Sequence, residues 1–190
     1  MVDDSGVAPG MLLVAAPGLL DPNFRRTVVF VIEHRVQGSL GVVLNRPSET
    51  AVQDVLPHWA PLASEPGAVC VGGPVEPETA LCLAALRTGQ DPDTVEGLTA
   101  VRGPVALVDL DGDPGALADR LRGLRLFAGY SGWDSRQLAG EISRGDWIVV
   151  PALPDDVVRS SGPELWARVL RRQGVPIALL ATYPSDVKLN

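Results

Sequence analysis

The chain has 190 residues, of which 46% are hydrophobic and 21% are charged, and its formal net charge is −7. This length and composition predict one globular domain with a sizeable core and exclude a disordered chain. The excess of acids argues against non-specific nucleic-acid binding, which needs a positively charged surface.

Residues 1–9 are small and acidic, without the basic and apolar segments of a secretory signal, and we expect a flexible tail there. A single domain is expected over residues 10–190. Because no apolar run approaches the length of a membrane span, a soluble, cytoplasmic protein is predicted. Cys70 and Cys82 lie outside any C-x-x-C motif, which favours reduced, buried thiols over a reactive or regulatory thiol.

Strands dominate the pattern along the chain. Runs of β-branched and apolar residues between turn signals predict strands at 10–16, 27–33, 40–44, 69–71, 105–110, 124–130 and 147–150. The short turn between 27–33 and 40–44 indicates an antiparallel hairpin. Residues 79–86 fit either a strand or a helix, because their length and apolar pattern decide nothing.

Helices are predicted from capping residues. Thr50 is expected to cap a short helix to Leu56, and Asp113 with Pro114 to begin one that reaches about Arg122. Asp134 with Gln137 forms a capping-box pattern for a helix through residue 143, and a further helix is expected over 163–173. Since strands come in succession, the sequence predicts an α+β fold with a mainly antiparallel sheet.

No motif of known chemistry is complete. His34 and His58 belong to no metal-binding spacing, and Asp109–Asp113 matches only the start of an EF-hand loop. There is no phosphate-binding glycine loop, and Ser131 lacks the second glycine of a nucleophile elbow because Trp133 stands there. We therefore assign no catalytic residue, no metal site and no cofactor.

Two polar groups are candidates for binding a ligand. Glu33 and His34 end one predicted strand, and Asn45 and Arg46 end the next, so the four could meet in a cluster that binds an anion or pins loops. Gly72-Gly73 follows a strand, and its amides could cradle an anion or simply reverse the chain.

The second group surrounds the segment Gly129–Trp133, which we interpret as tight glycine turns around two large aromatic residues, Tyr130 and Trp133. Gln137 and Glu141 follow four residues apart and share one helix face. The pair is either a solvated surface or the wall of a pocket beside Trp133.

The order and spacing of these segments resemble the YqgE/AlgH family of bacterial proteins. The resemblance runs from about Gly10 to Asn190, and its most specific part is Gly129–Trp133 followed by Gln137-Leu138 and Glu141-Ile142. It implies an α+β fold with a bent sheet folded into a pseudo-barrel flanked by helices. Asp134–Arg136 and Ala139 depart from the family's glycine turn and acid.

The resemblance implies no catalytic residues. One family member is named as a regulator of alginate production, and the family is labelled as transcriptional regulators. A cytoplasmic regulatory or small-ligand-binding module without catalysis is therefore the first hypothesis, with a small anionic ligand or a protein as partner. The oligomeric state is left open.

Two alternatives stay open. One is a hydrolase or transferase with Glu33 or Glu141 as general base and Arg46 as an anion clamp. The other is a DNA-binding regulator, disfavoured by the net charge, with either of two arginine sets as contacts: Arg120, Arg122 and Arg125, or Arg168, Arg171 and Arg172. Residues 51–119 carry eleven acids and two bases, whereas residues 120–190 carry seven acids and ten bases.

Overall fold

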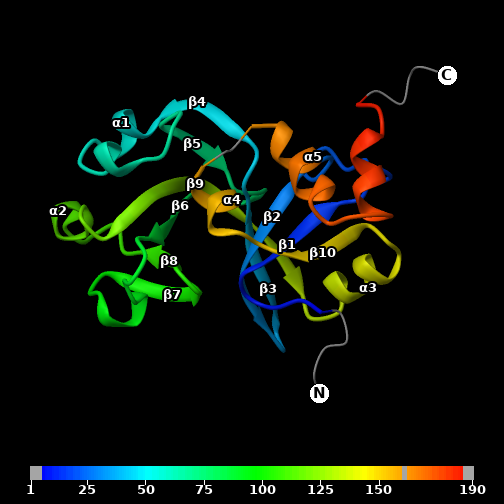
Figure 1. The fold of residues 1–190 in the computed structure, drawn as a ribbon, viewed down its shortest axis with the longest axis horizontal. Coiled ribbons are helices and arrows are strands. Elements are labelled where there is room, and N and C mark those ends of the chain that lie inside the picture. The colour runs from blue at the N-terminus through cyan, green and yellow to red at the C-terminus, as the bar shows by residue number, and fades with distance from the viewer. Residues whose placement is uncertain (1–5, 160–161, 186–190) are drawn as a thin grey trace.

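A long, curled β-sheet organises the computed structural model, which describes residues 6–159 and 162–185 (Figure 1). The strands are β1 (Met11–Ala15), β2 (Val28–Arg35), β3 (Gly38–Val43), β4 (Pro47–Ala51), β5 (Ala68–Val71), β6 (Val75–Leu86), β7 (Leu98–Arg102), β8 (Val105–Val108), β9 (Leu121–Asp134) and β10 (Trp147–Pro151). The helices are α1 (Val52–Val55), η1 (Ala60–Leu62), η2 (Pro92–Thr94), α2 (Pro114–Leu117), α3 (Gln137–Ser143), α4 (Pro154–Val158), α5 (Glu164–Arg171) and η3 (Ile177–Thr182).

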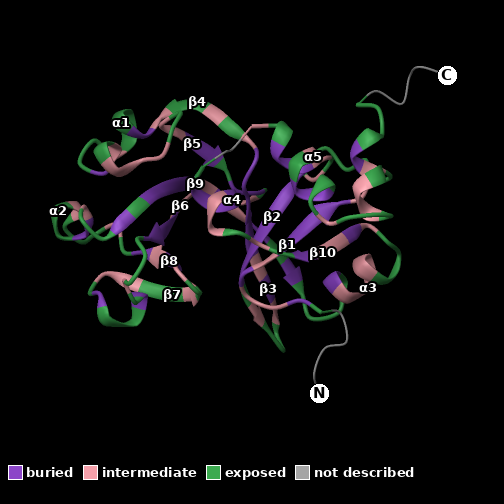
Figure 2. Cartoon of the chain, in the orientation of Figure 1, coloured by how far each residue is buried: buried purple, intermediate pink, exposed green. Residues whose placement is uncertain are grey.

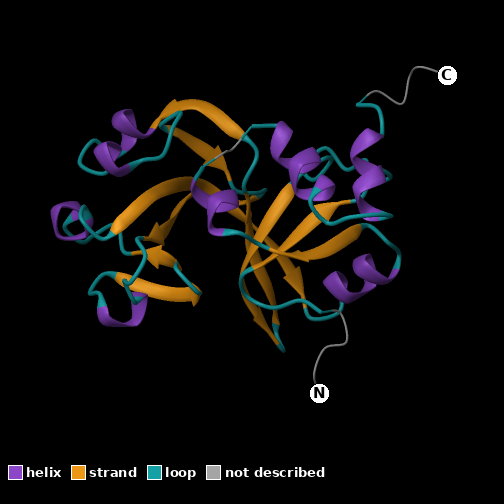
Figure 3. Cartoon of the chain, viewed as in Figure 1, coloured by secondary structure: helices purple, strands orange, loops and turns teal. Residues whose placement is uncertain are grey.

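The sheet follows the order β10-β1-β2-β3-β9-β6-β8-β7, and β5 joins it beside β9 with β4 outside. Its strand pairs are antiparallel apart from β5 with β9. The helices are short and lie around the sheet rather than alternating with its strands (Figure 3). The predicted α+β class with a mainly antiparallel, curled sheet is confirmed.

Strand β9 links the two halves of the sheet. Its first part pairs with β6, and its last residues pair with β3, where Ser131 lies opposite Gly41. Gly129 stands at the change of partner with φ +70°, and a Cβ there would lie 2.7 Å from the carbonyl oxygen of Gly73. Glycine is the residue that tolerates both the positive φ and the close backbone contact, so this crossing of the backbone depends on Gly129.

Three clusters of buried side chains form the core (Figure 2). The first lies between β1–β3 and the helix α5, whose Leu165, Trp166, Val169 and Leu170 face inward as predicted. The second fills the half built by β5–β9, and the third gathers the aromatic residues beside α3. Val7 is buried in the third cluster, whereas residues 1–5 of the predicted tail lie outside the described residues.

Several predicted elements match the structure. The hairpin of β2 and β3 is antiparallel as predicted, and residues 79–86 belong to the longer strand β6, which resolves their ambiguity. The N-cap residue of α3 is Arg136 and not Asp134 as predicted, but Asp134 Oδ1 still accepts from the backbone N–H groups of Arg136 and Gln137 at the start of the helix. These two hydrogen bonds lower the pKa of the Asp134 carboxyl.

Other predictions were wrong. The helix after Asp113 ends at Leu117, because the next leucine, Leu121, begins β9 and pairs with Leu86 instead of stacking on a helix face. The predicted turns over Gly129–Trp133 are strand, since β3 pairs with this segment. Thr50 lies in β4, and Ala51 precedes α1 without a side-chain cap.

The capping box predicted for Asp134 and Gln137 is incomplete. The Gln137 side chain donates to Glu141 Oε1 at 2.9 Å, so it does not reach back to the start of the helix. Within the described part of the chain, no helix has the length and apolar character needed to cross a membrane.

Candidate functional site

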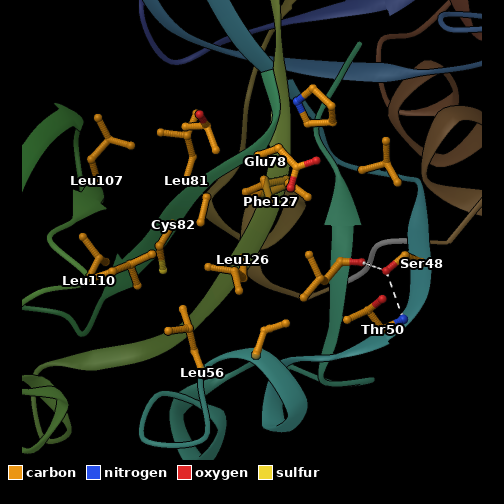
Figure 4. A pocket seen from close by; sticks show the side chains of 18 of the residues that line it. Ser48, Thr50, Leu56, Glu78, Leu81, Cys82, Leu107, Leu110, Leu126 and Phe127 are labelled. Atoms are coloured by element: carbon orange, nitrogen blue, oxygen red, sulfur yellow. Dashed lines mark hydrogen bonds between the residues drawn. The ribbon is translucent and has the colours of Figure 1, made fainter. Parts of the chain in front are cut away.

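A groove of about 940 Å³ lies between β4, β5 and α1 on one side and β6 and β8 on the other (Figure 4). Strand β9 passes along its floor, where the side chains of Leu126 and Phe127 are seen. Small-molecule sites in proteins have volumes of about 300–1,000 Å³ and mostly apolar walls. The groove therefore has the size of a ligand site.

The floor of the groove is apolar. Cys82 of β6 lies opposite Leu126 of β9 in the sheet register, and both side chains are almost fully buried. Burial raises the pKa of the Cys82 thiol to about 12, because a thiolate there would lose its hydration. At neutral pH this side chain is a protonated, weakly polar surface rather than a nucleophile.

The walls expose apolar surface to water. Leu56, Leu107 and Leu110 project toward the groove and are only half-buried (Figure 4). Covering such surface contributes about 25 cal/mol for each Å² removed from water. A ligand with an apolar body would gain this free energy without ordering a loop first, because the groove is already formed.

The side of the groove at β4 is held by a serine. Ser48 Oγ donates to the carbonyl oxygen of Val69 at 2.7 Å and accepts from the backbone N–H of Thr50 at 3.1 Å. These two bonds tie β4 to β5 beyond the sparse pairing of the two strands. The hydroxyl therefore shapes the wall and is not a free nucleophile.

The charged groups at the groove are all acids. Glu78, Asp109 and Asp111 are exposed at its edge, and Asp109 Oδ1 accepts from the backbone N–H of Asp111 at 3.0 Å. No Lys, Arg or His is found among the described residues that line it. In the sequence, Asp109–Asp113 was notable only as an incomplete calcium-binding loop. The described residues contain no group of side chains suited to a metal ion.

The first group of predicted site residues does not converge. In the antiparallel register Glu33 and His34 lie beside the turn, opposite Leu40 and Ser39, whereas Asn45 lies beside Val28 at the other end. Six extended residues separate the two ends by about 20 Å. The carboxyl ends of two successive strands lie at the same edge of a sheet when the strands are parallel. In an antiparallel hairpin they lie at opposite edges.

The residues of this group hold the local chain. Asn45 is buried, and its side chain accepts from the Val28 N–H and donates to the Arg26 carbonyl oxygen, each at 2.9 Å. His34 Nδ1 lies 2.7 Å from Ser39 Oγ across the hairpin. These contacts hold the two ends of the hairpin separately, at Asn45 and at His34, and not through one shared cluster.

Arg46 lies at a small crevice of about 60 Å³ that also includes Gly73. Its guanidinium donates to the Arg25 carbonyl oxygen at 3.2 Å, and burial lowers its pKa. The Gly72 N–H already donates to the Ala128 carbonyl oxygen, so the predicted anion cradle has lost one of its donors. The crevice has room for about two water molecules.

The second group of predicted residues does meet, apart from one member. Glu141 Oε2 accepts from the indole N–H groups of Trp133 at 2.9 Å and Trp147 at 2.7 Å, while Oε1 accepts from Gln137. The two indoles pack edge to face, with ring centroids 5.8 Å apart. Tyr130 packs against the first core cluster instead, on the other face of β9.

The two arginine sets lie on different kinds of element, since Arg168 and Arg171 are exposed on the helix α5. Arg122 and Arg125 lie in β9, where Arg122 pairs with Asp155 and Arg125 is buried. Arg172 follows α5 directly, and its guanidinium donates two hydrogen bonds of 2.6 Å to the buried carboxylate of Asp156. The candidate contacts Arg120, Arg122 and Arg125 share no helix, because residues 121–134 form a strand.

The fold and these segments define the class of the protein. The chain belongs to the AlgH-like family, whose sequence model matches residues 12–178. A UPF0301 protein of Rhodococcus jostii is 59% identical over 97% of this chain and 92% of its own length. A UPF0301 protein of Mycolicibacterium smegmatis is 56% identical over the same shares of the two chains.

Solved structures agree with this assignment. A crystal structure of a Corynebacterium diphtheriae protein matches with a TM-score of 0.89 and 39% identity over 93% of each chain. The solution structure of the AlgH protein from Pseudomonas aeruginosa matches with a TM-score of 0.67 and 28% identity, over 94% of this chain and 95% of that one. The family resemblance predicted from the sequence is confirmed.

Proposed function

We propose that this protein is a cytoplasmic regulatory module that binds a small molecule with an apolar body in the groove and carries out no reaction on it. The observation that carries the proposal is the preformed groove of about 940 Å³ with apolar walls open to water. Cys70 and Cys82 are buried and form no disulfide, which fits a reducing compartment.

The groups around the groove favour binding over chemistry. The Ser48 hydroxyl is engaged by two backbone groups, and burial keeps the Cys82 thiol protonated. The acids at the edge are exposed, where carboxylates are ordinary solvated groups. Such a site can hold and orient a molecule but offers no activated nucleophile.

The arrangement of side chains supports the hydrolase or transferase alternative less well than binding. That alternative required Arg46 close to Glu33 or Glu141, and the hairpin register places Glu33 and Arg46 at opposite ends. Glu141 accepts three hydrogen bonds that hold two tryptophans and Gln137. Its carboxylate therefore has a structural role that accounts for its position.

The test uses a neutral fluorescent probe and one blocking variant. Ala80 is an exposed residue of β6 at the groove, and Ala80→Trp should fill the space that a ligand would take. Dansylamide should bind the unmodified protein saturably with a blue-shifted emission. We expect Ala80→Trp to weaken this binding at least tenfold, measured by fluorescence titration.

The matched control is Ala100→Trp, which places the same side chain on the exposed face of the edge strand β7, outside the groove. It should bind dansylamide as the unmodified protein does. The proposal is contradicted if no saturable binding occurs, or if Ala80→Trp binds as tightly as the control.

A further inference from the structure

The charges around the groove are of one sign. Its described lining contains three carboxylates, Glu78, Asp109 and Asp111, and no basic residue. These carboxylates belong to the segment 51–119, which carries eleven acids and only two bases. These charges make the electrostatic potential at the groove negative, and the apolar walls, with their low dielectric constant, strengthen it.

Two of the carboxylates have a defined placement. Asp109 and Asp111 follow β8 and flank Leu110, whose side chain projects toward the groove (Figure 4). The hydrogen bond from the Asp111 N–H to Asp109 Oδ1 holds this turn, so the two acids stay at the edge beside an apolar contact. An apolar body against Leu110 would bring a ligand's end group next to both carboxylates.

We propose that the ligand of the groove is an amphipathic cation, with an apolar body against the leucines and an ammonium or similar group at Asp109 and Asp111. The proposal rests on the proposed function and adds the chemical class of the ligand. It replaces the small anionic ligand expected from the sequence, because an anion would be repelled at this edge. Each exposed carboxylate should contribute about two- to fivefold in affinity at low salt.

Three probes share the dansyl group and differ in the charge of the end group, and the salt dependence of binding separates the charge from the added apolar contact of the five-carbon chain of dansylcadaverine. Dansylcadaverine carries an ammonium, dansylamide is neutral and dansylglycine carries a carboxylate. In 20 mM salt we expect dansylcadaverine to bind about five- to twentyfold more tightly than dansylamide, with dansylglycine weakest. The gap should shrink in 500 mM salt, because ions screen exposed charges.

The variant that tests the site is Asp109→Asn with Asp111→Asn. Asparagine keeps the side-chain oxygen that accepts from residue 111, so the turn is retained while both charges are removed. This double variant should lose the salt-dependent part of the preference for dansylcadaverine, while its affinity for dansylamide stays unchanged.

A second acidic pair supplies the matched control. Asp91 and Asp93 repeat the same contact, since the Asp93 N–H donates to Asp91 Oδ1 at 3.0 Å, but they do not line the groove. Asp91→Asn with Asp93→Asn removes the same net charge and should leave the preference for the cation intact. A preference lost equally in both double variants would contradict the assignment to Asp109 and Asp111.

The outcomes distinguish the two proposals. Equal binding of the neutral and cationic probes to the unmodified protein, or tighter binding of dansylglycine, would overturn the cationic ligand and leave the groove as a binding site. Failure of all three probes to bind would overturn both proposals.

Discussion

At the residue scale, Arg125 is the side chain whose placement is least expected. It is 4% exposed, and its Nε and Nη2 have no hydrogen-bond partner among the described residues. Nη1 lies 3.9 Å from Cys70 Sγ, which is a weak acceptor. Burying a charge without a counter-charge costs several kcal/mol, so this guanidinium opposes folding.

We therefore predict that Arg125→Met stabilises the protein. Methionine keeps a long, flexible chain in the core and removes the uncompensated charge, so the free energy of unfolding should rise by about 1–3 kcal/mol. Urea denaturation followed by tryptophan fluorescence measures the change. Arg122→Met is the control, because that exposed ion pair with Asp155 should change the free energy of unfolding by less than about 0.5 kcal/mol.

A loss of stability in Arg125→Met would contradict this reading. It would mean that the contact of the guanidinium with Cys70 Sγ and its neighbours stabilises it by more than its burial costs. The acids on the neighbouring helix α4 are already paired, Asp155 with Arg122 and Asp156 with Arg172.

At the element scale, the close crossing of β9 with the segment before β6 fixes the bend of the sheet. A Cβ at Gly73 would lie 2.2 Å from the carbonyl oxygen of Tyr130, and the backbone of Gly73 has φ +156°. The neighbouring Gly72 carbonyl oxygen accepts from Val43 N–H and Ser131 Oγ. The two segments contact each other through their backbones, so no side chain can move to make room for a Cβ.

Gly73→Ala should therefore be strongly destabilising, by about 3 kcal/mol or more, because the backbone itself has to shift. Gly89→Ala is a suitable comparison, since Gly89 also has a positive φ, +84°, but meets no atom within 4 Å. It should cost only about 1 kcal/mol from backbone strain. Equal losses in urea denaturation would refute the role of the crossing.

Elements with a local signal could be predicted from the sequence. The hairpin of β2 and β3 and the inward face of α5 follow from strand runs and helical spacing. The helix α2 was extended too far because Leu117 and Leu121 have helical spacing, although Leu121 pairs across the sheet. Glycines suggested turns at Gly129–Trp133, where the pairing partner β3 lies about 90 residues earlier and leaves no local mark.

The candidate site was harder to predict than the fold. Trp133, Gln137 and Glu141 were grouped correctly because one helix turn and one strand end bring them together. The groove was missed, since its walls come from β4, β5, α1, β6, β8 and β9, which meet only after the sheet curls. The concentration of acids in residues 51–119 was its one visible signal.

At the scale of the whole molecule, the sheet divides into two parts with different tasks (Figure 1). The part built from β1–β3, β10 and the helices α3 and α5 contains the third core cluster and much of the first, which continues into the other part through Leu83 and Ala85 of β6. The part built from β4–β8 and the start of β9 carries the groove and the acidic segment. The two parts share the strand β9, which pairs with β6 in one and with β3 in the other.

The most direct test of the groove maps where a neutral probe touches the protein. Backbone amide NMR spectra recorded with increasing dansylamide should show saturable shifts concentrated on β6, β8 and α1, which border the groove. Shifts concentrated instead at the cluster of Trp133 and Glu141, or at the Arg46–Gly73 crevice, would contradict binding in the groove.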